Sequence, residues 1–74
     1  IMTTIKLEVK KAGVIPPIDN LALQVSDWYW GKTKVIGGEI KRCLVAYDFK
    51  FNKWLFSRAG HVELIEYYIE IQSL

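Results

Sequence analysis

The sequence predicts a mainly β fold: a small curled antiparallel sheet or open barrel of about five strands, with an α+β variant containing one short helix as the alternative. Three observations lead to this expectation. Apolar and polar residues alternate near both ends of the chain, glycines and prolines divide it into short segments, and isoleucine and tyrosine, which favour strands, are frequent in the tail. With 74 residues, the chain is expected to form one domain over residues 2–74.

The first strand is expected over residues 3–10. Ile5, Leu7 and Val9 point one way there, and Lys6, Glu8 and Lys10 point the other way. This alternation predicts one face on a core and one face in water. Gly13 and the pair at residues 16–17 end the strand and predict a stiff, extended connection.

Residues 18–30 fit two templates. As a helix, Ile18, Leu21, Val25 and Tyr29 share one face, and a proline falls in the first turn. As a strand, the segment alternates, but Asp27 then lies on its apolar side. A short helix over residues 17–26 that leads into a strand from about residue 28 satisfies both halves, and we adopt this interpretation.

The middle of the chain predicts short strands separated by turns. Turns are expected at residues 31–32 and, more strongly, at residues 37–38, with a short strand over 33–36 between them. Residues 39–47 predict a strand with Cys43, Val45 and Tyr47 on one side. Because Leu44 and Ala46 are apolar too, this strand is expected to be buried on both faces. A loop over 48–53 and a returning strand over 54–58 follow.

The residues Tyr47, Asp48, Asn52 and Trp54, after the glycine pair at 37–38, resemble the core of a kelch repeat. In that family these residues mark one blade of a β-propeller, and the resemblance covers roughly a quarter of the chain. A propeller needs several blades, for which this chain has no room. The resemblance therefore implies only a local feature, an Asp-initiated loop that joins two antiparallel strands.

The tail predicts a paired strand over residues 61–74. Ile65, Tyr67, Ile69 and Ile71 share one face, although Val62, Ile65 and Ile69 also fit a helical template. We expect the strand to be paired, because so apolar a strand would aggregate if it were exposed.

Composition excludes several classes of protein. Ten basic against eight acidic residues give a net charge of +2, which is too mild to indicate nucleic-acid binding by itself. The single cysteine, Cys43, allows no internal disulfide, which favours a reducing, cytoplasmic location. No apolar segment is long enough to span a membrane. Because hydrophobic types make up 51% of so small a chain, we expect a partner or a second copy to cover part of the apolar surface.

The sequence offers no recognisable catalytic or metal-binding equipment, so we expect neither an enzyme nor a cofactor. One histidine, His61, and one cysteine do not supply a zinc site, and Cys43 lies in an apolar run where an inert thiol is expected. His61 is expected in a surface loop. The glycines lack the spacing of a phosphate-binding loop.

Aromatic and basic residues interleave in two segments, and these carry the candidate binding site. The first contributes Trp28, Trp30, Lys32 and Lys34, and the second contributes Lys50, Lys53 and Trp54. Such surfaces suit a protein partner, because tryptophan dominates interface hot spots, or single-stranded nucleic acid, whose bases stack on aromatic rings. The same rings also suit a core.

Three hypotheses follow from this pattern. The leading one is a non-catalytic protein-interaction module, such as a regulator, inhibitor or accessory subunit. The alternatives are a domain that binds single-stranded nucleic acid and a structural subunit that self-associates as a homodimer.

Overall fold

Seven strands form one antiparallel sheet in the computed structural model, which describes residues 4–34, 37–57 and 60–73. The strands are β1 (Thr4–Lys11), β2 (Ile18–Asn20), β3 (Val25–Ser26), β4 (Tyr29–Lys34), β5 (Ile40–Asp48), β6 (Lys53–Ser57) and β7 (Gly60–Ser73). The predicted mainly β class is confirmed, with two more strands than the five expected.

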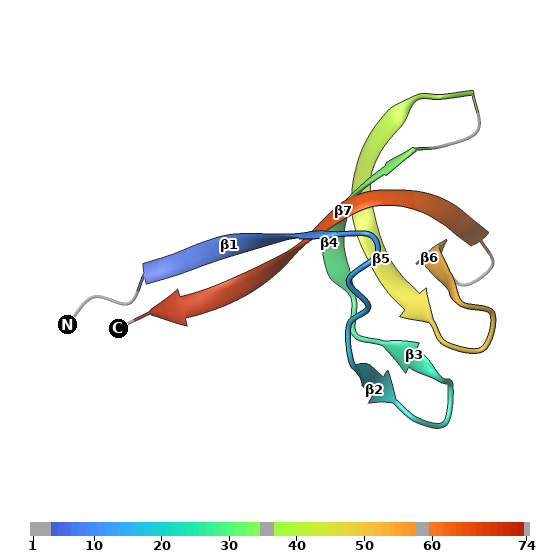
Figure 1. The fold of residues 1–74 in the computed structure, drawn as a ribbon, viewed down its shortest axis with the longest axis horizontal. Coiled ribbons are helices and arrows are strands. Elements are labelled where there is room, and N and C mark those ends of the chain that lie inside the picture. Colours follow the sequence, from blue (N-terminus) through green and yellow to red (C-terminus); the bar gives the residue numbers. More distant parts are fainter. Residues whose placement is uncertain (1–3, 35–36, 58–59, 74) are drawn as a thin grey trace.

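The sheet curls on itself, because β4 and β6 each pair with both of the longest strands, β5 and β7 (Figure 1). The path runs β1-β7-β4-β5-β3-β2, and β6 pairs with both β5 and β7. β4 and β6 thus each connect β5 to β7, from opposite sides of a small core. β1 and β2 remain as the two ends of the path, so the sheet is curled but is not a closed barrel.

The expected short helix over residues 17–26 is wrong. Two short strands, β2 and β3, occupy this segment and pair with each other across a turn. The Asn20 side-chain oxygen accepts a hydrogen bond from the Leu23 backbone N–H at 3.0 Å, and Gln24 has a φ of 54°. Both features belong to turns and interrupt a helix. Within the described residues there is no helix, and hence none long and apolar enough to cross a membrane.

The first strand is confirmed, but the expected burial of its apolar face is wrong. Ile5, Leu7 and Val9 are 60%, 62% and 56% exposed. The reason is visible in Figure 1, where β1 and the end of β7 leave the body together as a two-stranded arm. We use "the arm" for residues 4–9 of β1 and their partners, residues 68–73 of β7.

β4 and β5 also differ from expectation in detail. The expected turn at residues 31–32 is absent, because β4 runs straight through Gly31 and pairs with β5 along its whole length. The expected strand over 33–36 is represented only by the end of β4, and residues 35–36 lie outside the described ranges. The turn at Gly37 and Gly38 is confirmed by their φ angles of 98° and 84°. β5 is buried on both faces, as expected, only in its last four residues, 45–48, whereas Leu44 is exposed.

β7 is a strand, as predicted, and a bulge changes which of its residues face the core. Its register with β4 shifts between Lys32 and Thr33, so that Glu66 pairs with Lys32 but Leu64 pairs with Thr33. The extra residue on β7 is Ile65. Leu64 before it and Tyr67 after it are both buried, although strict alternation would place them on opposite faces.

Among the described residues, five buried side chains pack together as the core cluster: Val45, Tyr47, Trp54, Leu64 and Tyr67. The Tyr67 ring lies 5.3 Å from Tyr29 and 4.9 Å from Trp54, measured between ring centroids. The polar tips of two of these rings reach the connection between β1 and β2. The Tyr67 hydroxyl donates a hydrogen bond to the Val14 carbonyl, and Trp54 Nε1 donates one to the Ala12 carbonyl at 3.3 Å. The connection is therefore tied across one end of the core.

We expect Gly31→Ala to destabilise the protein by about 1–3 kcal/mol, because it overpacks the core. A Cβ atom at Gly31 would lie 2.8 Å from Val45 Cγ2 and 3.0 Å from Leu64 Cδ1. The matched control is Gly13→Ala, where a Cβ atom meets nothing within 4 Å. Urea unfolding of the two variants measures the difference, and equal stability would contradict the packing described.

Candidate binding surface

The outer face of the sheet carries a row of apolar side chains that crosses four strands. Val9 of β1 lies opposite Tyr68 of β7, Tyr68 lies opposite Trp30 of β4, and Trp30 lies opposite Leu44 of β5. Directly opposite residues in antiparallel strands project to the same face, with Cβ atoms about 4.5–5.5 Å apart. Side chains far apart in the sequence thus form one continuous strip.

A hollow of about 600 Å³ adjoins this row. Trp28, Trp30, Leu44, Tyr68 and Leu7 line it together with Asp27, Tyr29, Ile69 and Glu70. Trp28 and Trp30 are 44% and 49% exposed. We call the following residues the outer apolar surface: Leu7, Val9, Trp28, Trp30, Leu44 and Tyr68.

Trp28 is held in place by a short chain of hydrogen bonds that begins in the sheet. The buried Ser26 hydroxyl accepts a bond from the Tyr47 backbone N–H at 2.7 Å and donates one to the Asp27 carbonyl at 2.8 Å. The Asp27 carboxylate in turn accepts a bond from the Trp28 N–H at 2.8 Å. The link between β3 and β4 is therefore fixed to β5, which limits how far Trp28 can move.

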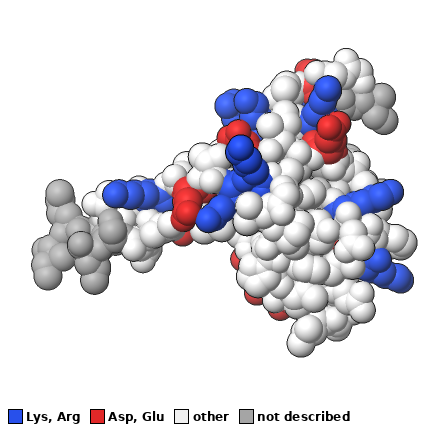
Figure 2. Space-filling model, in the orientation of Figure 1, with Lys and Arg blue, Asp and Glu red and all other residues white. Residues whose placement is uncertain are grey.

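A row of charged side chains runs parallel to the apolar row, and each of its members lies two residues away from an apolar member on the same strand. Lys11 and Lys32 both lie opposite Glu66, and Lys32 also lies opposite Arg42. Lys34 follows at the end of β4 and is exposed. Because β4 runs straight through Gly31, Trp30, Lys32 and Lys34 alternate with the buried Gly31 and Thr33. On the face shown in Figure 2, charges of both signs are interspersed along the arm and the upper body.

Two carboxylates, Asp27 and Glu70, line the hollow itself. Burial raises the pKa of Tyr29 above its ordinary value of 10.0, and the negative charges of Asp27 and Asp19 raise it further. Burial, and then the neighbouring Tyr29, raise the pKa of Tyr67 as well. Tyr29, which lines the hollow beside Asp27 and Glu70, therefore stays neutral at physiological pH.

The second aromatic and basic segment does not join this surface. Trp54 is only 6% exposed and belongs to the core, so its expected place on an exposed surface is wrong. Lys50 and Lys53 are exposed, and Lys53 lines a separate hollow that shares no residue with the first. Lys50 Nζ lies 5.6 Å from the ring centroid of Phe51, its neighbour in the loop.

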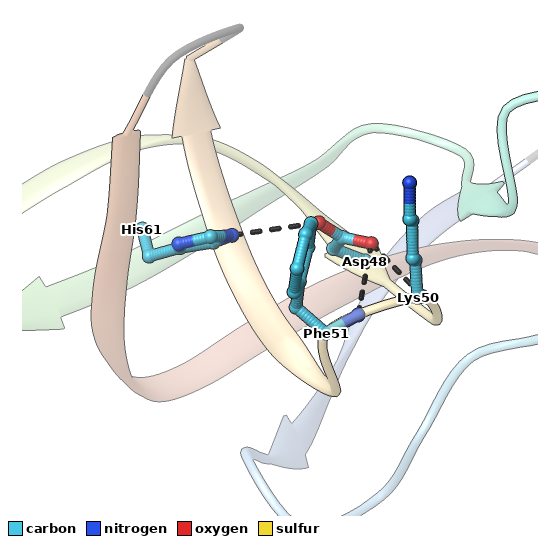
Figure 3. Close-up of polar contacts among 4 residues, drawn as sticks. All are labelled: Asp48, Lys50, Phe51 and His61. Carbon is cyan, nitrogen blue, oxygen red and sulfur yellow. Dashed lines mark hydrogen bonds and ion pairs between the residues drawn. The ribbon is translucent and has the colours of Figure 1, made fainter.

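Asp48 organises the loop between β5 and β6, as Figure 3 shows. Its Oδ1 accepts hydrogen bonds from the backbone N–H groups of Lys50 at 2.9 Å and Phe51 at 3.4 Å. Its Oδ2 lies 3.4 Å from His61 Nε2, and the His61 ring meets the edge of Phe51. The expected Asp-initiated loop between antiparallel strands is confirmed. His61 is at the surface, as expected, but in β7 and not in a loop.

The groups considered for chemistry are engaged with other residues. His61 contacts Asp48, while the half-buried Cys43 thiol lies 3.8 Å from the Thr33 hydroxyl. Among the described residues, no three histidine, cysteine or acidic side chains gather as a metal site would require.

The chain matches no protein-family model, no curated protein and no solved structure to which it was compared.

Several members of the surface were not predicted from the sequence. Leu7 and Val9 were expected in the core, Leu44 was expected to be buried, and Tyr68 was assigned no role. Each becomes part of the surface only through its cross-strand neighbours. Strand alternation within β7 is the one available signal, because it places Tyr68 on the face opposite to Tyr67 and Ile69.

Acrylamide quenching of tryptophan fluorescence should resolve two populations, because Trp28 and Trp30 are exposed and Trp54 is buried. We expect Trp54→Phe to leave emission that is red-shifted and readily quenched. The paired change Trp28→Phe with Trp30→Phe should leave blue-shifted, poorly quenched emission. Loss of the readily quenched population in Trp54→Phe would contradict this arrangement.

The protein should lose stability as the pH rises above 10. In the unfolded chain the two tyrosines ionise near their ordinary pKa of 10.0, whereas in the folded protein the pKa of Tyr29 and of Tyr67 is higher. The unfolded state therefore binds fewer protons in this range, and the free energy of unfolding falls with pH. The contribution is complete below pH 10 and is lost as the pH passes the folded-state values.

Urea unfolding at a series of alkaline pH values, with phenolate absorbance followed in parallel, measures this effect. Tyr29→Phe should make the decline in stability shallower. A decline of unchanged steepness in Tyr29→Phe would show that this hydroxyl does not contribute.

Proposed function

We propose that the protein is a non-catalytic protein-interaction module that binds its partner through the outer apolar surface. The observation that carries this proposal is the exposure of Trp28 and Trp30 beside a hollow that Leu7, Leu44 and Tyr68 also line. Tryptophan is enriched among the residues that contribute most to protein interfaces, above all where the ring enters a well-packed pocket.

The position of these residues supports binding more than their number does. Exposed apolar side chains scattered singly are normal, whereas a contiguous patch marks an interaction site. Here the register of four strands places Val9, Tyr68, Trp30 and Leu44 side by side. Trp30 and Leu44 lie on β4 and β5, which pair with strands on both sides within the body, so little conformational entropy is lost when a partner contacts these side chains.

The charges favour a protein partner over single-stranded nucleic acid. Asp27 and Glu70 line the hollow, and Glu66 lies opposite two of the lysines in the adjoining row. A phosphate backbone laid along the tryptophans would meet these carboxylates at close range. A protein segment with apolar side chains for the hollow and a lysine or arginine beside them would meet complementary charge.

The non-catalytic part of the proposal rests on the surroundings of the two reactive side chains. The Cys43 thiol lies against Thr33, and the His61 ring lies against Asp48 and Phe51. Neither group lines the larger hollow, so the surface that we propose for binding carries no nucleophile or imidazole base.

Peptides selected from a random displayed library on the immobilised protein provide the test. We expect enrichment of sequences that combine aromatic or aliphatic residues with lysine or arginine. Replacing Trp28 or Trp30 with alanine should weaken binding of the selected peptides by about 2 kcal/mol, roughly thirtyfold, as for a central hot-spot residue. Thermal unfolding verifies that the variants fold, which we expect because both rings are about half exposed.

The matched control is Phe51→Ala, which removes an exposed aromatic ring outside the outer apolar surface and should leave peptide affinity unchanged. Equal loss in Phe51→Ala, or peptides that do not distinguish the tryptophan variants, would overturn the proposal. A short oligonucleotide is tested in parallel. Tight binding that weakens steeply with salt and depends on Trp30 and Lys32 would favour the nucleic-acid alternative.

A further inference from the structure

β1 presents a free edge along its whole length. Its pairing with β7 runs without interruption from Thr4 opposite Ser73 to Lys11 opposite Glu66. Among the described residues it pairs with no other strand, and it ends the path of the sheet. About half of its backbone N–H and C=O groups therefore point away from β7. Such an edge is a template on which a further strand can add.

The usual protection of an edge strand is only partly present. β1 has neither a proline nor a bulge, and its apolar residues are exposed. Lys6 and Lys10 place positive charge on the edge, which opposes pairing with a similar strand. Glu8 lies between them and forms an ion pair with Lys10 at 2.8 Å. The strand therefore alternates in charge and can complement itself.

These charges have no opposite charge across from them within their own chain. Lys6 lies opposite Ile71, Glu8 lies opposite Ile69, and Lys10 lies opposite Tyr67. The ion pair of Glu8 runs along its own strand. A strand added at the free edge would supply the first charged neighbours across the sheet for this face of the arm.

Among the antiparallel registers centred near the middle of the strand, two place unlike charges opposite each other, with a two-fold axis through Leu7 or through Val9. The axis through Val9 pairs Glu8 with Lys10 but sets Leu7 opposite Lys11. With a two-fold axis through Leu7, Lys6 of each copy lies opposite Glu8 of the other copy. An axis through Lys6 places the two Lys6 side chains opposite each other. An axis through Glu8 places Glu8 opposite Glu8 and Lys6 opposite Lys10. Like charges directly opposite are destabilising, so charge disfavours the axes through Lys6 and through Glu8.

The register with its axis through Leu7 also matches the apolar face. Ile5 of each copy lies opposite Val9 of the other copy, and the two Leu7 side chains lie opposite each other. An axis between two residues would instead set apolar side chains opposite charged ones, because it shifts the pairing by one residue. Of the two registers that match unlike charges, only the one with its axis through Leu7 therefore also matches the apolar face.

We propose that β1 pairs antiparallel with β1 of a second copy of this chain, about a two-fold axis through Leu7. The contact is isologous, since each copy contributes the same strand. The proposal goes beyond the proposed function, because it assigns a second interaction surface, the free edge of β1, to a different partner. It joins the two sheets into one and places both outer apolar surfaces on the same face. Leu7 lines the hollow in each copy, so the dimer presents two hollows to a partner.

The size of the contact predicts a weak dimer. One pair of short strands buries less than the roughly 1,200–2,000 Å² of a standard stable interface. We therefore expect a monomer at low micromolar concentration and a dimer that accumulates toward millimolar concentration.

Sedimentation equilibrium of charge variants tests the contact. Lys6→Glu keeps the ion pair between Glu8 and Lys10 but places the introduced carboxylate opposite Glu8 twice in each dimer, so the dissociation constant should rise about tenfold. Glu8→Lys should weaken the dimer similarly, because the introduced ammonium group then lies opposite Lys6. An equimolar mixture of the two variants should associate as tightly as the unchanged protein, because the unlike charges then match again.

The control is Lys53→Glu, which makes the same change of net charge at an exposed position on β6 and should leave the dissociation constant unchanged. Far-UV circular dichroism and thermal unfolding verify that each variant folds. The proposal is overturned if the unchanged protein stays monomeric at millimolar concentration, if the mixture associates no better than either variant alone, or if Lys53→Glu weakens the dimer equally.

A disulfide tests the register. In a Cys43→Ser background, Leu7→Cys places two thiols directly opposite each other, at a Cα separation of about 5 Å that a disulfide spans. Ile5→Cys is the matched control, because its opposite residue is Val9 of the other copy. We expect rapid cross-linking for Leu7→Cys and slow cross-linking for Ile5→Cys. Equal rates, or a faster rate for Ile5→Cys, would overturn the axis through Leu7.

The two proposals fail separately. Replacing Trp28 and Trp30 with alanine should leave the dimer intact, and Lys6→Glu should leave the affinity of selected peptides unchanged. Loss of peptide binding with an intact dimer, or of the dimer with intact peptide binding, therefore identifies which surface was affected.

Discussion

The packing of aromatic rings around Tyr67 is the interaction on which the rest of the structure depends. Tyr67 is almost fully buried and contacts Tyr29 and Trp54. Its hydroxyl finds an acceptor in the Val14 carbonyl, so burial of the polar tip does not leave an unpaired group. Large rings with satisfied tips give a small chain much buried apolar area from few residues. The same bonds fix the connection between β1 and β2 against the core.

This packing places two demands on the strands around it. Gly31 lies directly opposite Tyr67 on β4, and the space beside it is filled by Val45 and Leu64. The bulge at Ile65 is the second demand, because Leu64 and Tyr67 face the core together only if the strand shifts phase between them. Both features allow the sheet to curl over a core of five residues.

The strands that alternate could be predicted closely from the sequence. β1, β5 and β7 each begin and end within one residue of the expected positions, because period-two alternation is a local property. β2 and β3 could not be predicted, because strands of three and two residues show no period. What distinguishes them from a helix is the Asn20 side-chain bond and the positive φ of Gln24, and neither leaves a pattern in the sequence.

The candidate site divides in the same way. Alternation predicts that Trp30, Lys32 and Lys34 share one face only if the chain runs straight through Gly31; a turn was expected there, but β4 is continuous. It could not show that Leu7, Leu44 and Tyr68 join them, because that depends on the register between strands distant in the sequence. Nor could it separate Trp54 from the other two tryptophans. An aromatic ring beside lysines has the same local pattern whether it lies in the core or at the surface.

The exposed arm connects the small core to the two surfaces. The core has room for few side chains, so the apolar residues of β1 project beyond it. An isolated two-stranded ribbon is marginally stable in water, and three or more strands with an apolar face are needed for independent stability. At the end of the arm next to the body, β4 supplies a third strand. At the other end, no strand among the described residues does so. A second β1 would turn the ribbon into four strands, so pairing and ordering of the arm should strengthen each other. Leu7 lies on the arm and also lines the hollow, so its side chain belongs to the outer apolar surface while the backbone of the same strand offers the free edge. The free edge and the apolar surface are thus distinct contacts on one strand.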